Sequence, residues 1–138
     1  MTWELSMRFN TDPPVMRAVR RLAASACRDE GASEIEAGLV GMSLGEALAN
    51  ACLHAYNNGI GPVTVDVEYL RPRMILSVHN HGSPVPDTTT VPDAQPDQES
   101  RDWGLYVIGR VMDEVEIERS PHSDHGTLIR MTKYLTLP

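Results

Sequence analysis

The sequence predicts an α+β fold, a two-layer sandwich in which a mixed, mostly antiparallel sheet carries its helices on one face. Segments whose apolar residues alternate with polar ones are interspersed with segments whose apolar residues recur at helical spacing. Their order is strand, helix, helix, two strands, long loop, helix and two strands, which segregates the helices from a largely antiparallel sheet. The 138 residues suffice for one domain, spanning 1–138, with a modest core.

The first strand and the first helix are predicted near the N-terminus. Apolar and polar residues alternate from Trp3 to Phe9, which is the period of a half-buried strand. Asp12 and Pro13 then supply an N-cap and a first helical residue. The expected apolar face of this helix consists of Val15, Ala18, Val19, Leu22 and Ala26, and the arginines expected to point away from it are Arg17, Arg20, Arg21 and Arg28.

A second helix is predicted from a capping box at Ser33 and Glu36 to about Asn57, where Asn58-Gly59 offers a left-handed stop. Its helical spacing places six residues on one apolar stripe: Val40, Leu44, Ala47, Leu48, Ala51 and Ala55. Three glycines weaken an isolated helix by about 1 kcal/mol each, so we expect close packing on a sheet or a ligand to compensate for them. These glycines are Gly38, Gly41 and Gly45.

The rest of the chain predicts a hairpin, a long loop and a final helix with two strands. Residues 63–67 alternate, and 74–78 are apolar enough for a central strand, with the turn at Arg71-Pro72-Arg73. Residues 82–102 are rich in proline and lack an apolar period, and loops of this length in a compact domain are usually functional or disordered. A short helix over 105–112 and strands near 115–117 and 127–132 follow.

Composition excludes several classes of protein. The formal net charge of -7 argues against a broad surface for direct nucleic-acid binding, and no apolar run approaches the length of a membrane span. The N-terminus lacks the layout of a secretory signal. Cys27 and Cys52 lie in apolar, apparently helical stretches without metal-ligand spacing, so we expect free thiols in a reducing compartment. These observations favour a cytoplasmic protein with no membrane partner.

Polar residues follow one edge of the second helix beside its apolar stripe. They are spaced by three or four positions: Ser43, Glu46, Asn50, His54 and Asn57. Leaving such groups buried without partners costs about 1–3 kcal/mol each. A solvated helix edge or a polar network under a loop would satisfy them, and the spacing alone favours that explanation. A polar ligand with a hard cation would also satisfy them, since an Asn oxygen suits magnesium and a Glu can accept a proton.

Four motifs occur in an order that resembles the GHKL (Bergerat-type) ATP-binding family along essentially the whole chain. The first spans 46–51 with His54, and the second, 78–82, falls where that family reads adenine. The third spans 103–108 with 112–115, and the fourth, 126–131, resembles the family's last glycine-containing strand. Within the family, the chain most resembles the anti-sigma-factor serine kinases of partner-switching pathways.

This resemblance implies a Bergerat (histidine-kinase-like ATPase) fold that uses ATP and Mg²⁺. Asn50 would coordinate the magnesium ion, and Glu46 would be the general base. The loop at about 82–102 would be a mobile ATP lid, in which Arg101 contacts phosphate. The residues implied to bind the nucleotide are Asn50, His54, Asn80, Gly82, Arg101, Gly104, Leu105 and Thr127.

The resemblance also implies partners. The protein would sequester a sigma factor, phosphorylate a serine of a STAS-type anti-sigma-factor antagonist, and form a homodimer. Arg17, Arg20 and Arg21 would be either ordinary surface charges or a contact for an acidic partner.

Two residues depart from the family pattern. Asn80 stands in place of the adenine-reading aspartate; its oxygen could still accept the exocyclic amine, but without charge assistance. Asp102 stands where a glycine is common, and it would either repel phosphate or cap the following helix. These residues keep open a kinase-weak or kinase-dead binding module that regulates a partner by sequestration. The catalytic half of a sensor histidine kinase is the third alternative.

Overall fold

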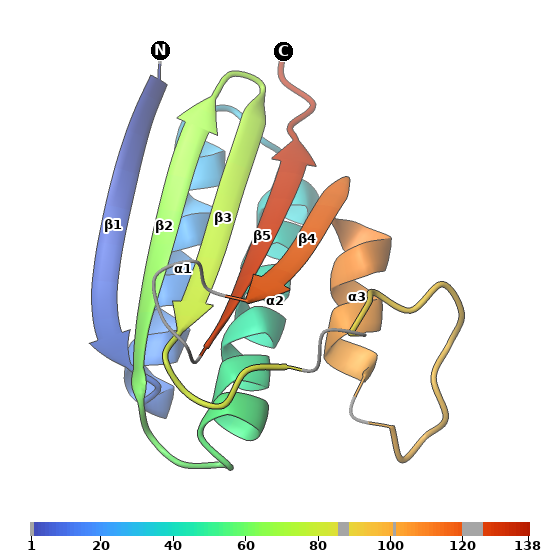
Figure 1. The fold of residues 1–138 in the computed structure, drawn as a ribbon. Coiled ribbons are helices and arrows are strands. Elements are labelled where there is room, and N and C mark those ends of the chain that lie inside the picture. Colours follow the sequence, from blue (N-terminus) through green and yellow to red (C-terminus); the bar gives the residue numbers. More distant parts are fainter. Residues whose placement is uncertain (1, 86–88, 101, 120–125) are drawn as a thin grey trace.

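The computed structural model describes residues 2–85, 89–100, 102–119 and 126–138, and it forms two layers (Figure 1). The helices cover one face of the sheet, and the chain termini lie at the same end of it. The elements in chain order are β1 (Thr2–Asn10), α1 (Pro13–Asp29), α2 (Glu34–Asn50), the π-helical turn η1 (Ala51–Ala55), β2 (Pro62–Leu70), β3 (Arg73–Asn80), α3 (Trp103–Val111), β4 (Glu114–Arg119) and β5 (Thr127–Tyr134).

The five strands lie in the order β1-β2-β3-β5-β4. Each neighbouring pair is antiparallel, so the described sheet is more uniform than the mixed sheet that we expected. The α+β sandwich class is confirmed. The last two strands do not join the sheet in chain order, because β5 pairs with β3 and leaves β4 at the edge beside α3 (Figure 1).

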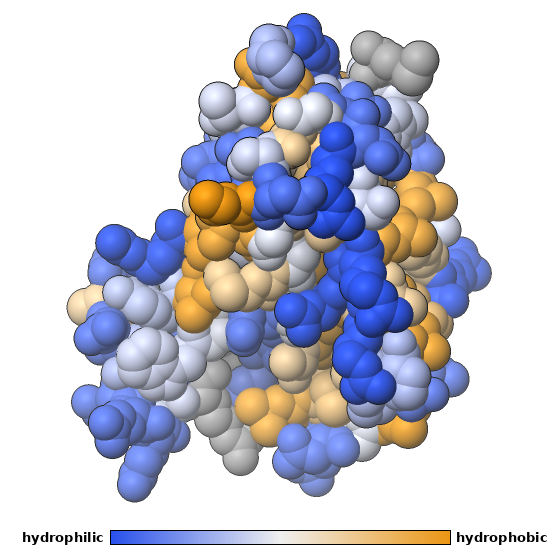
Figure 2. Space-filling view, turned by 180° about the vertical axis from the view of Figure 1, so that it is seen from behind, coloured by the Kyte–Doolittle hydropathy of each residue, from blue (hydrophilic) through white to orange (hydrophobic). Residues whose placement is uncertain are grey.

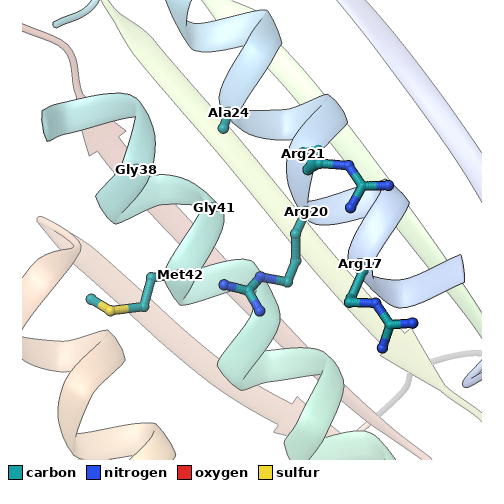
Figure 3. Close-up of a pocket in the computed structure, with 7 residues that line it drawn as sticks. All are labelled: Arg17, Arg20, Arg21, Ala24, Gly38, Gly41 and Met42. Atoms are coloured by element: carbon teal, nitrogen blue, oxygen red, sulfur yellow. The ribbon is translucent and has the colours of Figure 1, made fainter. Parts of the chain in front are cut away.

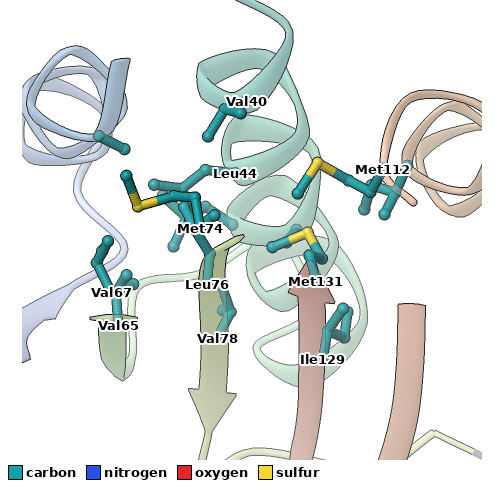
Figure 4. Close-up of a cluster of buried hydrophobic side chains, with 14 of the residues drawn as sticks. Val40, Leu44, Val65, Val67, Met74, Leu76, Val78, Met112, Ile129 and Met131 are labelled. Carbon is teal, nitrogen blue, oxygen red and sulfur yellow. The ribbon is translucent and has the colours of Figure 1, made fainter. Parts of the chain in front are cut away.

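The core lies between the sheet and α2. All six residues of the expected apolar stripe on this helix are buried, which confirms that prediction. Val40 and Leu44 point toward side chains of β2, β3 and β5 in Figure 4, among them Val65, Leu76 and Met131. This continuous apolar stripe thus holds the helix against the middle of the sheet and determines which of its sides remain for other contacts.

The apolar face predicted for α1 was partly wrong. Val15 and Leu22 are 37% and 42% exposed, whereas Val19, Ala23 and Cys27 are buried. The buried face therefore contains smaller residues than the predicted one. This choice follows from the neighbouring helix, because a β-carbon placed on Gly41 of α2 would lie 3.4 Å from both the Ala24 Cβ and the Arg20 carbonyl oxygen.

The glycines of α2 pack against different neighbours from those that we expected. An added β-carbon on Gly41 would make van der Waals contact with α1, whereas Gly45 makes room for the Arg20 side chain, whose Nε would lie 2.6 Å from an added β-carbon. Their compensation is therefore helix–helix packing, not the sheet or a ligand. Gly38 has no heavy atom within 4 Å of its added β-carbon, so the structure gives it no packing role.

The second helix ends close to the predicted position but changes its form on the way. The α-helix stops at Asn50, and residues Ala51–Ala55 form a π-helical turn. Asn57 and Asn58 have φ values of 50° and 65°, which is the left-handed stop expected near this point. The Ala55 carbonyl oxygen accepts a hydrogen bond from the Ser83 N–H at 3.1 Å, so this turn is tied to the segment after β3.

No helix in the described part of the chain has the length and apolar character needed to cross a membrane.

The two thiols should react very differently. Cys27 is fully buried, and desolvation raises the pKa of its thiol to about 12, so little reactive thiolate forms near neutral pH. Cys52 is half-buried and donates to the Gly59 carbonyl oxygen at 3.3 Å. We expect iodoacetamide at pH 8 to modify Cys52 in the folded protein and Cys27 only after unfolding. Mass spectrometry of digested samples measures this, with Cys52→Ser as the control. Equal labelling of both cysteines in the native state would contradict it.

Candidate functional site

The polar edge of the second helix lies at the boundary of the core. Glu46, Asn50 and His54 are half-buried, and Ser43 is fully buried. In the described part of the molecule, the side chains of Glu46, Asn50 and His54 receive no hydrogen bond or ion pair. The predicted polar network under a loop is therefore not formed by these residues. A carboxylate, an amide and an imidazole remain available for a ligand.

Glu46 lies against the first turn of α3. A β-carbon on Gly104 would be 3.0 Å from Glu46 Oε2, so glycine at this position lets the helix start beside the carboxylate. The unpaired N–H groups of a helix start attract phosphate. The general base implied by the motif and a phosphate-attracting backbone thus lie side by side, although they come from distant parts of the chain.

Asp102 occupies the N-cap position of α3 without acting as a side-chain cap. Its carbonyl oxygen accepts the Tyr106 N–H at 2.9 Å, whereas its exposed carboxylate forms no capping hydrogen bond. This bond is the first hydrogen bond of the helix itself, so the Asp102 side chain does not cap the N–H groups of the first turn. The carboxylate stays near the start of the helix, where it opposes phosphate binding.

A second group of expected site residues lies at the end of the sheet, where β3 and β5 pair. Asn80 is 6% exposed, and its Oδ1 accepts hydrogen bonds from the N–H groups of Gly82 and Thr127, both at 3.3 Å. The Thr127 hydroxyl in turn accepts from the Val85 N–H at 3.0 Å. These bonds join the start of the long loop to β5. They also use both lone pairs of Oδ1, so the expected acceptance of an adenine amine by this oxygen does not fit.

Close backbone packing explains the glycines at this end of the sheet. A β-carbon on Gly82 would collide with the Ala55 carbonyl oxygen of η1, and one on Gly126, where φ is +108°, would collide with the Asn80 carbonyl oxygen. Both positions thus require glycine for local structure. Tyr56, which the sequence did not single out, strengthens the same junction because its hydroxyl accepts the His81 N–H at 2.8 Å. Its sequence signal is its place near the predicted end of the second helix, directly after Ala55.

The predicted lid is described in part. Trp103 donates its indole N–H to the Asp97 carbonyl oxygen at 2.9 Å and meets Tyr106 edge-to-face, with ring centroids 5.7 Å apart. Trp103 therefore anchors the loop to α3. Leu105 is buried in the core at 4% exposure, which leaves only its backbone to face a ligand. Arg101, the expected phosphate contact, lies outside the described residues.

The donor set fits magnesium and phosphate. Carboxylate and amide oxygens, as at Glu46 and Asn50, are hard donors that Mg²⁺ accepts, and it usually takes only one or two protein ligands besides phosphate oxygens and water. The α3 N-terminus supplies amides for phosphate. This part of the site is consistent with a metal-bound polyphosphate.

A basic groove lies on the opposite side of the helical layer from the sheet. Figure 2 shows a hydrophilic stripe running down this face between apolar areas. The groove, of about 340 Å³, is lined by Arg17, Arg20 and Arg21 together with residues of α2, and Arg20 reaches across toward α2 in Figure 3. None of these three arginines forms an ion pair with any described residue. On a chain of net charge -7, this is a local concentration of unpaired positive charge.

The fold and these motifs match a known family. Residues 9–133 match the model of the histidine kinase-like ATPase domain, and the chain therefore belongs to this family. The expected family is confirmed by this match.

Two relatives within this family have sequences similar to that of this chain. The chain is 33% identical over 99 residues to an anti-sigma F factor of Caldanaerobacter subterraneus subsp. tengcongensis, in a match covering 67% of this chain and 66% of that protein. It is 31% identical over 104 residues to the serine-protein kinase RsbW of Staphylococcus aureus, covering 68% of this chain and 63% of the relative. The matches thus span slightly less than two thirds of these relatives.

Solved structures agree on the fold. The RsbU and RsbW domains of Rv1364c from Mycobacterium tuberculosis superpose with a TM-score of 0.69 at 20% identity, covering 99% of this chain and 33% of that one. The histidine kinase domain of a blue-light-activated kinase from Erythrobacter litoralis gives a TM-score of 0.60 at 19% identity, covering 87% and 61%.

Two glycine substitutions separate site packing from helix propensity. Gly82→Ala should lower the free energy of unfolding by about 1–3 kcal/mol, because the methyl group meets the η1 backbone. Gly38→Ala should be neutral or stabilising by up to about 1 kcal/mol, because its surroundings are open. Urea unfolding of both variants measures the difference. The junction would not be tightly packed if Gly82→Ala proved as stable as Gly38→Ala.

Proposed function

We propose that this protein is an anti-sigma factor with protein serine kinase activity. It sequesters a sigma factor and uses a magnesium-bound nucleoside triphosphate, ATP in the family pattern, to phosphorylate a serine of a STAS-type anti-sigma-factor antagonist. We place it in the cytoplasm as a homodimer. The observation that carries the kinase proposal is the half-buried Glu46 carboxylate, which has no partner among the described residues and lies against the N-terminus of α3. The names of the two relatives support the pathway.

The proposed chemistry assigns one role to each part of the site. Glu46 accepts the proton of the substrate serine while the serine Oγ forms a bond to the γ-phosphorus and the bond to the β–γ bridging oxygen breaks, releasing the nucleoside diphosphate. Asn50 provides an oxygen ligand for Mg²⁺, which would neutralise charge on the phosphates. The first amides of α3 orient the phosphate chain. His54 and Thr127 complete the proposed nucleotide contacts, with Arg101 from the lid.

The basic groove is the proposed contact for the protein partners. Arg17, Arg20 and Arg21 are exposed and unpaired within the described structure, so an acidic segment can approach them without breaking an existing ion pair. Arginine is well suited to this role because its planar fork binds carboxylates through two hydrogen bonds.

A second candidate function is a binding module that keeps the fold and sequesters a partner with little or no kinase activity. Two observations favour it. The exposed Asp102 carboxylate opposes phosphate at the start of α3, and Asn80 Oδ1 is occupied by backbone donors. The two functions differ in turnover, not in partner binding.

Removing the proposed base tests the kinase function. Glu46→Gln keeps the shape of the side chain but cannot accept the serine proton, so phosphotransfer from radiolabelled nucleotide to a candidate antagonist should fall at least about 100-fold. Nucleotide binding, measured by calorimetry, should persist. Glu36→Gln, on the first turn of the same helix, is the matched control and should retain activity. Undiminished labelling in Glu46→Gln would exclude Glu46 as the base, and a wild-type protein that binds its partner without turnover would favour the second candidate.

Charge reversal in the groove tests partner binding. Arg20→Glu should weaken binding to a cognate sigma factor about tenfold or more, with the larger loss at low salt, because it introduces repulsion at the proposed acidic contact. Arg71→Glu makes the same charge change in the exposed turn between β2 and β3 and should have little effect. Surface plasmon resonance against each sigma factor of the source organism measures both. Equal affinities of the two variants would place the partner elsewhere.

A further inference from the structure

The side-chain amide of Asn80 is held in one orientation. It lies on the helix-facing side of the sheet, since Asn80 pairs with the buried Val63. The two groups that face its Oδ1 are the backbone N–H groups of Gly82 and Thr127. Backbone N–H groups can only donate, so the atom that meets them must be the oxygen. Turning the amide over would place its NH₂ against two donors.

The other end of this amide is therefore a hydrogen-bond donor. The two bonds to Oδ1 use both of its lone pairs, and the polar atom that remains is Nδ2 with two N–H donors. No described residue accepts a hydrogen bond from it. The nearby Thr127 hydroxyl already accepts from the Val85 N–H. Although Asn80 as a whole is only 6% exposed, Nδ2 is not among the buried atoms that lack a partner in the described residues, so this donor is accessible from outside and an acceptor on a bound ligand can reach it.

We infer that this site selects a purine nucleotide that carries a carbonyl oxygen at C6 over one that carries an amino group there. The inference rests on the proposed nucleotide site and adds Asn80 to it as the base contact, the role that the family resemblance implies for this position. Adenine presents an NH₂ donor at this position, so two donors would face each other, whereas guanine and hypoxanthine present the acceptor O6. Aspartate in place of Asn80 would offer one oxygen to the backbone and a second to an amine. Asparagine has a nitrogen where aspartate has its second oxygen, so the atom facing the base changes from a hydrogen-bond acceptor to a donor.

Calorimetry with ITP and ATP, each with magnesium, tests this inference directly. ITP differs from ATP in carrying the C6 carbonyl and lacks the additional amino group of GTP. We expect the wild-type protein to bind ITP at least about tenfold more tightly than ATP, because bound ATP would leave two N–H donors facing each other without an acceptor. Asn80→Asp should shift the ratio of the two affinities toward ATP by at least about tenfold.

Asn10→Asp is the matched control, because it adds the same charge at an exposed position on β1 and should leave the ratio unchanged. Thermal unfolding of each variant checks that the fold is intact. We expect the Asn80→Asp variant to keep its fold, because an aspartate oxygen can accept both backbone hydrogen bonds. The inference would be overturned if the wild-type protein bound ATP as tightly as ITP, or if Asn80→Asp left the ratio of the two affinities unchanged. Either result would leave the proposed nucleotide site standing. Absence of binding of either nucleotide to both proteins would overturn the proposed nucleotide site as well.

Discussion

The burial of α2 against the sheet is the constraint on which the rest of the structure depends. Its apolar stripe is inaccessible to water along the helix, with Val40 and Leu44 fully buried. Once that stripe faces the strands, the rotation of the helix is determined. One flank then meets α1 and the other meets α3, which brings Glu46 against Gly104. The position of the proposed base is thus a consequence of hydrophobic packing.

Close backbone packing at the end of the sheet is the second determinant of the site. The loop after β3 folds back on η1 because Gly82 has no side chain, and Asn80 ties this loop to β5 through two backbone amides. This arrangement satisfies buried polar groups without water. It also commits the Asn80 oxygen to the protein, which gives one residue both a structural role and a proposed role in base selection.

Pattern analysis succeeded where the periodicity was strong and the burial one-sided, as for the strands and for the stripe of α2. The face predicted for α1 was partly wrong because helical spacing does not show how closely α2 approaches that helix. Leu22 belongs to the predicted apolar face but is exposed, whereas the smaller Ala23 is buried on the face that α1 presents to the core. The π-helical turn Ala51–Ala55 was also not predicted, since its residues would equally suit an α-helix.

The sequence by itself determined the α+β class, the order of the elements, the family motifs and the polar edge that contains Glu46, Asn50 and His54, because these depend on residue type and spacing along the chain. Tertiary structure alone decided which groups meet. The contact of Glu46 with Gly104 and the bonds from Asn80 to Gly82 and Thr127 join segments or orient atoms in ways that spacing cannot specify. Hydrogen-bond direction is set by the partners in space, and one of the two partners of Asn80, Thr127, comes from another strand.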